Sequence, residues 1–193
     1  MDIRSMSKNR RGFTSLAFAG CVVLTLVIFL APASYGATAQ QIDSGVDVAL
    51  RRFSNEVEGG KELLQKARGV LVFPKVIKAG LGIGGEYGEG ALRVGGQTVD
   101  YYATAAGSMG IQLGGQTKMV IICFMKEEAL KRFRNSSAWK AGVDASAVAI
   151  NFGAGTSVDT IANGDPVVGF IFGQQGLMFD ANLEGGKLTK LKR

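Results

Sequence analysis

Residues 69–90, GVLVFPKVIKAGLGIGGEYGEG, decide the fold of this chain. A short apolar run, Gly69–Phe73, has the composition of a strand that Pro74 terminates, and a glycine-rich segment follows. Gly80, Gly82 and Gly84 alternate with Leu81 and Ile83, and this period of two is typical of a β-strand. One face of such a strand is bare backbone, which lets a neighbouring strand, helix or ligand approach closely. The stretch therefore predicts a tightly curved β core, in which these glycines lie on a crowded face.

Short apolar runs separated by glycines continue through the rest of the chain, as in a meander of strands. Glycine makes up 28 of the 193 residues, about twice the usual proportion of ~7%. Glycines at strand bends allow a small sheet to curve without clashes. We therefore expect a mostly antiparallel sheet that is strongly curved or barrel-like, with turns at Gly95-Gly96 and Gly114-Gly115. Its strands are expected at 69–73, 80–87, 90–94, 99–106, 108–113, 118–125, 145–152, 167–172, 177–180 and 187–191.

Two segments have the periodicity of helices. Residues 40–57 repeat apolar side chains at spacings of three and four, which gives an amphipathic N-terminal helix. Gly59-Gly60 is expected to end it, and residues 61–67 form a second short helix. Residues 126–135 form a mid-chain helix by composition, followed by a loop over 136–142 that contains Trp139. The fold class is therefore α+β. The apolar stripe of the first helix consists of Ile42, Val46, Leu50, Phe53 and Val57.

The first 39 residues are expected to be a secretory signal peptide. A basic start that includes Arg10-Arg11 precedes an almost uninterrupted apolar run over residues 13–31. Small-x-small cleavage patterns end at Ala33 and at Ala39, so the mature chain begins near Ser34 or Gln40. An uncleaved membrane anchor is an alternative, because the run is long enough to span a bilayer. Twin-arginine export and lipidation at Cys21 are two further alternatives.

The remaining residues, 40–193, are expected to form a single domain, because a chain of about 150 residues buries roughly two-thirds of its unfolded surface. They carry 18 Lys and Arg against 15 Asp and Glu, a net charge of only +3. This small excess, without a zinc-finger, helix-turn-helix or RNA-binding motif, does not favour a nucleic-acid partner. Cys123 is the single cysteine of this segment, so the fold depends on packing rather than on a disulfide.

The residue types available for catalysis are few. The chain contains no histidine, which removes the most common general base and metal ligand. Cys123 lies within an apolar strand and is expected to be a buried structural thiol rather than a nucleophile. Residues 80–85 match GxGxxG, but they are not followed by the helix that a dinucleotide site requires. We therefore expect no catalytic residue, no metal and no cofactor, and hence no enzyme.

The acidic residues do not indicate a site either. Glu86 and Glu89 would face opposite sides of a strand, and we expect them to be solvated carboxylates. Asp43 and Asp47 share a face of the first helix, four residues apart. Two carboxylates without other partners make a poor metal site, so neither pair is assigned a function.

Four basic residues are better candidates for binding. Lys75 and Lys78 are expected on the loop before the glycine-rich strand, and Arg51 and Arg52 lie on the first helix. Such an arrangement suits anionic lipid head groups, because each cation near a membrane surface contributes about 1 kcal/mol. An apolar helix face beside cations can also lie in the membrane interface. The alternative is an ordinary charged surface over a helix that packs on the core.

Longer motifs give a family resemblance. Residues 67–92, ARGVLVFPKVIKAGLGIGGEYGEGAL, resemble the opening of the SYLF domain, and the resemblance continues through 99–125, 129–150 and 176–188. It implies a non-enzymatic domain. Eukaryotic members bind phosphoinositides and in some cases bind or bundle actin, whereas bacterial members are typically exported or lipid-anchored. The resemblance also implies that the N-terminal helix, here residues 40–57, contributes to lipid binding through its basic residues.

We therefore expect an exported, non-enzymatic protein at the periplasmic or envelope membrane surface. It would bind anionic, phosphoinositide-like head groups through Arg51, Arg52, Lys75 and Lys78. The alternative is a protein-interaction scaffold similar to the actin-binding relatives, with a protein partner and no direct lipid ligand. The helix over 40–57 separates the two. An apolar stripe packed on the sheet favours a rigid ligand-binding or scaffold domain, and an exposed stripe favours membrane contact.

Overall fold

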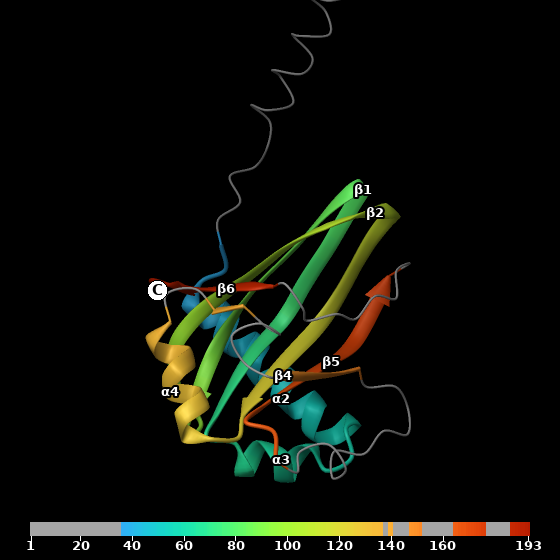
Figure 1. Ribbon diagram of the computed structural model, residues 1–193. Coiled ribbons are helices and arrows are strands. Elements are labelled where there is room, and N and C mark those ends of the chain that lie inside the picture. Colours follow the sequence, from blue (N-terminus) through green and yellow to red (C-terminus); the bar gives the residue numbers. More distant parts are fainter. Residues whose placement is uncertain (1–35, 137–138, 141–146, 152–163, 177–185) are drawn as a thin grey trace, which may run out of the picture. The chain divides into compact units, whose positions relative to one another are not determined.

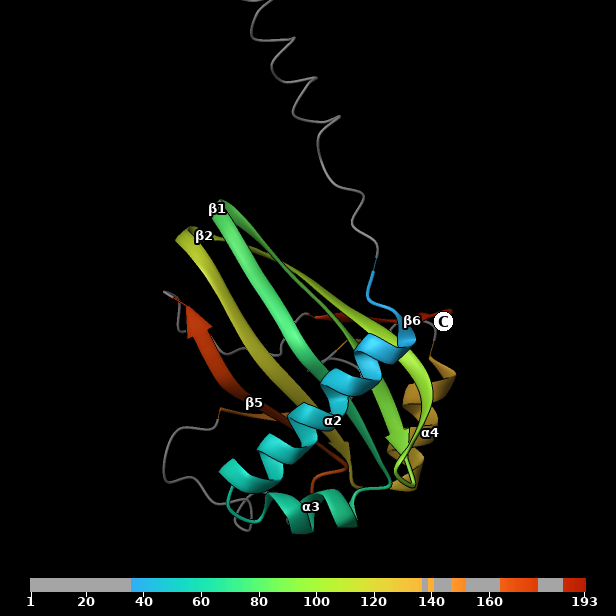
Figure 2. The ribbon, with the colours of Figure 1, turned by 180° about the vertical axis from the view of Figure 1, so that it is seen from behind.

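The computed structural model describes residues 36–136, 139–140, 147–151, 164–176 and 186–193. Ala37–Arg193 forms one compact unit, and its described part is α+β, as expected (Figures 1 and 2). The expected strand at 177–180 lies outside the described residues, as does almost all of the expected signal peptide. In order, the elements are α2 (Ala39–Glu56), α3 (Gly60–Lys66), β1 (Gly69–Val94), β2 (Gln97–Phe124), α4 (Glu127–Asn135), β3 (Trp139–Lys140), β4 (Ala147–Asn151), β5 (Val167–Gly176) and β6 (Lys187–Leu191).

The centre of the sheet is a single long hairpin. β1 and β2 pair antiparallel along their whole length. Gly95 and Gly96 form the expected turn between them, with φ angles of 59° and 81° that residues with a side chain rarely adopt. The hairpin therefore places the glycine-rich segments of β1 and β2 side by side, as paired residues of neighbouring strands.

The expectation of several short strands in this region was wrong. Pro74 does not end the first strand, because it lies at an irregularity between Phe73 and Val76 where the register shifts. A proline is tolerated at such a bulge, where its missing N–H breaks no regular ladder bond. Gly114 and Gly115 likewise lie within β2 rather than in a turn. Apart from the turn at Gly95-Gly96, the glycines of this region lie inside two long strands and do not mark turns between short ones.

β1 folds back so that its two halves lie face to face (Figure 1). A Cβ on Gly88 would lie 2.8 Å from the carbonyl oxygen of Lys75, and one on Gly90 would lie 2.7 Å from the ring of Phe73. A straight strand would separate Lys75 and Gly88 by roughly 40 Å. The backbone of the returning half therefore lies directly on the first half, and only glycine fits at these two positions.

The other strands add to the free edge of β2. β5 pairs with residues 116–124 of β2, and β6 pairs with residues 101–105, both antiparallel. β3 pairs antiparallel with β6, and β4 pairs parallel with β5. The order β3-β6-β2-β5-β4, with β1 on β2, is open. The described strands confirm a mostly antiparallel sheet, but they do not close into the barrel that the sequence suggested as one form.

The hydrophobic core has two parts, one on each face of the first half of β1. Val70 and Val72 pack with α2 and α3, whereas Leu71 and Phe73 pack with α4. This alternation follows from the two-residue period of a strand. Phe53 of α2 belongs to the first part and makes an edge-to-face contact of 5.0 Å with Phe170 of β5. The second part includes Phe124, Leu130, Phe133 and Trp139.

Helix α2 packs its apolar side on the sheet (Figure 2). Ile42, Val46 and Phe53 of the expected stripe are almost fully buried, together with Ala49. The helix approaches closely at Gly45, where a Cβ would lie 2.9 Å from Cγ of Pro74. By the criterion set out from the sequence, this packing favours a rigid ligand-binding or scaffold domain over a helix that inserts into a membrane.

The mid-chain helix forms as expected, and its Ala129, Leu130 and Phe133 are buried. Trp139 does not lie in a loop. It forms β3, opposite Leu188 of β6, and its ring meets that of Phe133 edge-on at 5.5 Å. Trp139 is a strand residue because its large side chain is buried in the core beneath α4. This burial brings the backbone of Trp139 to the edge of the sheet, where it pairs with β6.

No helix in the described part of the chain is both long enough and apolar enough to cross a bilayer. The apolar run of residues 13–31 lies outside the described residues. The described domain already includes Ala37, Thr38 and Ala39, which the sequence had assigned to the leader.

Candidate functional site

The four basic residues predicted as a lipid site are divided between two environments. Arg51 and Arg52 lie on α2, and Lys75 is exposed on β1. Lys78 is 6% exposed and lies within β1 rather than on a loop. The loop was wrongly expected because β1 continues past Pro74, and strand alternation then directs Lys78 inward. Lys78 cannot contact a membrane surface from this position.

Arg52 already has a carboxylate partner on its own helix. Its Nε and Nη2 donate to the two carboxylate oxygens of Glu56, at 2.7 and 3.1 Å. This hydrogen bonding raises the pKa of Arg52 above its ordinary value. Nη1 lies 3.7 Å from Sδ of Met119 on β2. Arg52 therefore connects α2 to β2, and the pairing with Glu56 leaves only part of its charge available to a ligand.

Arg51 and Lys75 differ from Arg52. Both are exposed, and neither forms an ion pair with any residue that the structure describes. Two exposed apolar side chains lie on the same two elements: Val48 on α2 is 46% exposed and Ile77 on β1 is 47% exposed. We call these four residues, Val48, Arg51, Lys75 and Ile77, the α2-side patch.

The contacts of α2 place Val48 beside the uncovered part of the sheet. Gly45, Val48 and Arg52 are spaced by three and four residues, so they lie along one side of the helix. Gly45 contacts Pro74 of β1, and Arg52 contacts Met119 of β2. Val48 therefore lies on the helix flank between these two contacts.

The strand register places Ile77 and Lys75 on the same side of the sheet as α2. Ile77 pairs with Thr117, which lies two residues before Met119 and so shares its face. Arg52 of α2 contacts Met119 on that face. Lys75 lies two residues before Ile77 and points the same way. Val48, Lys75 and Ile77 thus lie where the flank of α2 meets the open strand face. Arg51 follows Val48 by three residues and lies next to it on the outer side of the helix.

Lys78 belongs to a polar cluster inside the folded hairpin. It pairs in register with Gln116, which is 2% exposed and whose amide nitrogen and oxygen both lack a hydrogen-bond partner among the described residues. Two residues further along β2, Lys118 lies 2.9 Å from the carboxylate of Glu86, and the two side chains are 2% and 15% exposed. The expectation that Glu86 is solvated was wrong.

This interior cluster was detectable in part from the sequence. Gln116 and Lys118 share their strand face with Val120, Ile122 and Phe124, all of which are buried. The alternation of residues 116–124 therefore directs two polar side chains towards the core. The partner from the returning half of β1 was not detectable, because nothing in the sequence fixes where the hairpin folds back.

The side chain of Glu89 is likewise only 8% exposed, and it is paired rather than freely solvated. Its carboxylate accepts hydrogen bonds from the Ala37 backbone N–H at 2.8 Å, from the Tyr87 hydroxyl at 2.7 Å and from Arg193 Nη2 at 2.8 Å. Burial, followed by the hydrogen bond to Glu89, raises the pKa of Tyr87. This carboxylate joins the start of the described domain to its last residue.

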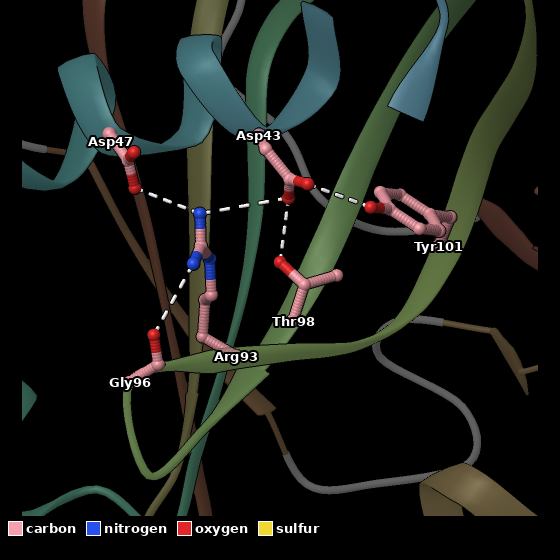
Figure 3. Close-up of polar contacts among 6 residues, drawn as sticks. All are labelled: Asp43, Asp47, Arg93, Gly96, Thr98 and Tyr101. Atoms are coloured by element: carbon pink, nitrogen blue, oxygen red, sulfur yellow. Dashed lines mark hydrogen bonds and ion pairs between the residues drawn. The ribbon is translucent and has the colours of Figure 1, made fainter. Parts of the chain in front are cut away.

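Figure 3 shows a third polar group, where α2 meets the hairpin. Asp43 accepts hydrogen bonds from Thr98 Oγ1 at 2.6 Å and from the Tyr101 hydroxyl at 2.8 Å, and Arg93 Nη2 lies 2.8 Å from Asp47 Oδ1. The hydrogen bond to Asp43, with a smaller contribution from burial, raises the pKa of Tyr101. The prediction that Asp43 and Asp47 lack partners was wrong. They fasten α2 to the hairpin.

The described residues offer no arrangement for metal or thiol chemistry. They contain no group of three or more His, Cys, Asp or Glu side chains that could hold a metal ion. Cys123 is fully buried, as expected. Its burial raises the pKa of the thiol to about 12, so at neutral pH it stays protonated and lacks the thiolate that a nucleophile needs.

The structure defines the class of this protein: an α+β domain built on a long folded hairpin, with helices on both faces of the sheet. Residues 105–193 match the family model described as "Ysc84: Las17-binding protein actin regulator". This match confirms, over residues 105–193, the resemblance to the SYLF-domain family found in the sequence. A search of curated proteins found no match.

The family match begins within β2 and extends to the end of the chain. It therefore includes Gln116 and Lys118 of the interior cluster. None of the four residues predicted as a lipid site lies within it. The match thus covers the later part of β2, α4 and the strands that follow, and it does not include the α2-side patch, for which the evidence is the geometry of this chain.

Proposed function

We propose that this protein binds anionic lipid head groups at an envelope membrane, as a rigid non-enzymatic domain. The observation that carries the proposal is the α2-side patch. It combines two exposed cations that have no carboxylate partner in the described structure with two apolar side chains that are nearly half exposed. This combination favours binding to a membrane interface, because the cations interact with lipid phosphates while the short apolar side chains enter the head-group layer.

The geometry favours contact through the surface over insertion of α2. The stripe that would insert is packed on the sheet, and Gly45 holds the helix against Pro74. Two cations, at about 1 kcal/mol each near a charged membrane, give weak and reversible attachment. Arg52 adds less because Glu56 neutralises it. Lys78 is left out of the proposed site because it is buried.

The proposal includes export. A basic start, a long apolar run and two small-residue cleavage patterns support it. Export would place the domain in the periplasm or on an envelope membrane surface, where it can meet anionic lipid head groups.

A second candidate function is that of a protein-interaction scaffold. The family model that matches residues 105–193 is described by its binding to a protein, Las17, and by regulation of actin. The packed stripe of α2 is also consistent with a rigid scaffold. In this alternative a protein partner, and no lipid, would contact the same patch.

Liposome co-sedimentation tests the proposal. The chain without residues 1–33 should bind vesicles that contain anionic phospholipid, should ignore neutral vesicles, and should bind less at high salt, because exposed charges are screened over about 8 Å at physiological ionic strength. The variant Arg51→Glu/Lys75→Glu should lose most of this binding. The control Lys187→Glu/Lys192→Glu makes the same change in net charge at exposed positions of the C-terminal segment. Lys190 is unsuitable as a control because it is paired with Asp100.

Equal loss in both double variants would show that the attraction is diffuse and that the patch is not a site. Absence of binding to anionic vesicles would remove the lipid proposal. In that case a salt-dependent pull-down of a protein partner in the absence of lipid, abolished by Arg51→Glu/Lys75→Glu, would support the scaffold.

A further inference from the structure

We propose that the export peptidase cuts after Ala33, so that the mature protein begins at Ser34 and not at Gln40. The sequence offers both positions, since Ala31-Pro32-Ala33 and Ala37-Thr38-Ala39 both have the small-x-small pattern. The inference rests on the proposed export but not on lipid binding. The structure favours the first position because a mature chain that begins at Gln40 would lack residues 37–39, which the folded domain uses.

Thr38 begins helix α2. Its hydroxyl accepts a hydrogen bond from the Gln41 N–H at 3.2 Å, and its own N–H donates to the Gln41 side chain at 2.8 Å. This reciprocal capping box satisfies donors that a helix N-terminus otherwise leaves without partners. The Thr38 carbonyl also accepts from the Ile42 N–H at 3.0 Å. A cut after Ala39 removes every one of these contacts.

Ala37 is attached to the domain as well. Its N–H donates to Glu89 of β1 at 2.8 Å, and its side chain packs against the core beneath α2. Glu89 is 8% exposed and also binds Arg193. A cut after Ala39 takes away the only backbone donor that Glu89 has among the described residues, and it leaves a nearly buried carboxylate with fewer partners. Such a loss destabilises the fold.

The cut after Ala39 also places a charge where the helix does not favour one. Hydrolysis converts the amide bond into a carboxylate on the preceding residue and an ammonium group on the following one. At Gln40 this ammonium lies in the first turn of α2, and the positive end of the helix dipole repels it. In a chain that begins at Ser34 the same ammonium is three residues before Ala37 in the sequence, and not on the first turn of α2.

The cleavage position can be measured directly. The full chain is expressed in a bacterium that exports proteins, and the mass and N-terminal sequence of the processed form are determined. We expect Ser34 as the first residue. The variant Ala33→Gln should accumulate as the uncut precursor, whereas Ala39→Gln should be processed like the wild type. Glutamine is too large for the position before the cut, and at position 39 it suits the first turn of a helix.

A second measurement tests the structural reason. The proteins Ser34–Arg193 and Gln40–Arg193 should differ in melting temperature, the shorter being lower by about 2–4 °C or more. Equal melting temperatures would overturn the argument from Thr38 and Ala37. A processed chain that begins at Gln40, or a precursor blocked by Ala39→Gln, would overturn the assignment but leave export standing. An uncut chain, or a chain cut before Cys21, would overturn the assignment, and intact Met1 in the membrane would also remove the proposed export.

Discussion

Glu86 and Lys118 form an ion pair between the two halves of the folded hairpin. Glu86 lies on the returning half of β1, where it pairs with Ala106, and Lys118 lies on the part of β2 that pairs with the first half. Lys118 Nζ is 2.9 Å from Glu86 Oε1, and the two side chains are 2% and 15% exposed. A buried pair of this kind requires both partners, because a single charge left in the interior is strongly unfavourable.

We therefore expect Lys118→Met to lower the free energy of unfolding by about 3–5 kcal/mol. The double variant Lys118→Met/Glu86→Leu should recover much of this loss, because it removes the stranded carboxylate. The matched control is Lys131→Met, which breaks the exposed pair with Glu127 on α4 and should cost less than about 1 kcal/mol. Chemical denaturation measures all three variants. A loss in Lys118→Met no larger than in the control would show that the hairpin does not depend on the pair.

The close approach of the two halves of β1 gives a second prediction. At Gly90 an added Cβ would meet the carbonyl of Val72 and the ring of Phe73. Gly90→Ala should therefore cost about 1–3 kcal/mol through overpacking. Gly107→Ala is the control, because a Cβ there has no neighbour within 4 Å, and it should be neutral or slightly stabilising. Similar melting temperatures for the two variants would mean that the halves of β1 do not lie together as described.

These two sites show what the sequence could and could not predict. Strand periodicity identified the glycine-rich region as β, and helical periodicity found α2 and α4 within a few residues. The crowding expected at Gly82 and Gly84 stays a prediction. The side-chain surroundings of Gly82 lie outside those described, and the close contacts occur at Gly88 and Gly90. Crowding depends on where the hairpin folds back, and that is set by contacts across the sheet.

The candidate site was predictable to a similar extent. Arg51 and Lys75 were identified from their charge and their position, and the structure leaves both exposed. Lys78 was misplaced because a proline was taken as the end of a strand, and the shift of register at Pro74 then reversed the expected exposure. Val48 and Ile77 were missed. An exposed apolar residue in a sequence looks the same as a buried one until the neighbouring element is placed.

Gln116 gives a third prediction. It is 2% exposed, and in the part of the chain that the structure describes neither its amide nitrogen nor its amide oxygen has a hydrogen-bond partner. An unsatisfied buried polar group costs about 1–3 kcal/mol, whereas an apolar group of the same shape carries no such penalty. Gln116→Met should therefore raise the free energy of unfolding by about 1 kcal/mol or more. Thermal and chemical denaturation test this, with Gln175→Met as an exposed control on β5. A destabilised Gln116→Met would indicate that the amide is satisfied in solution.

Cys123 gives the last prediction, and it concerns pH. Burial raises the pKa of the thiol to about 12, while an unfolded cysteine titrates near 8.5. A raised pKa means that the folded state binds the proton more tightly. The contribution to stability is complete below about pH 8.5 and is lost as the pH rises towards 12. Desolvation, with a smaller effect of Asp100, raises the pKa of Tyr102 to about 12 as well, so both groups act in this alkaline range.

The free energy of unfolding should therefore fall between about pH 9 and pH 12, and the fall should be shallower in Cys123→Ala. That variant should also lose about 1 kcal/mol or a little more at neutral pH, through the loss of buried volume. Tyr102→Phe is the matched control, since it removes the second group of raised pKa and leaves the thiol. In the native protein a thiol reagent should label Cys123 only at the rate of unfolding, and rapid labelling at pH 8 would contradict its burial.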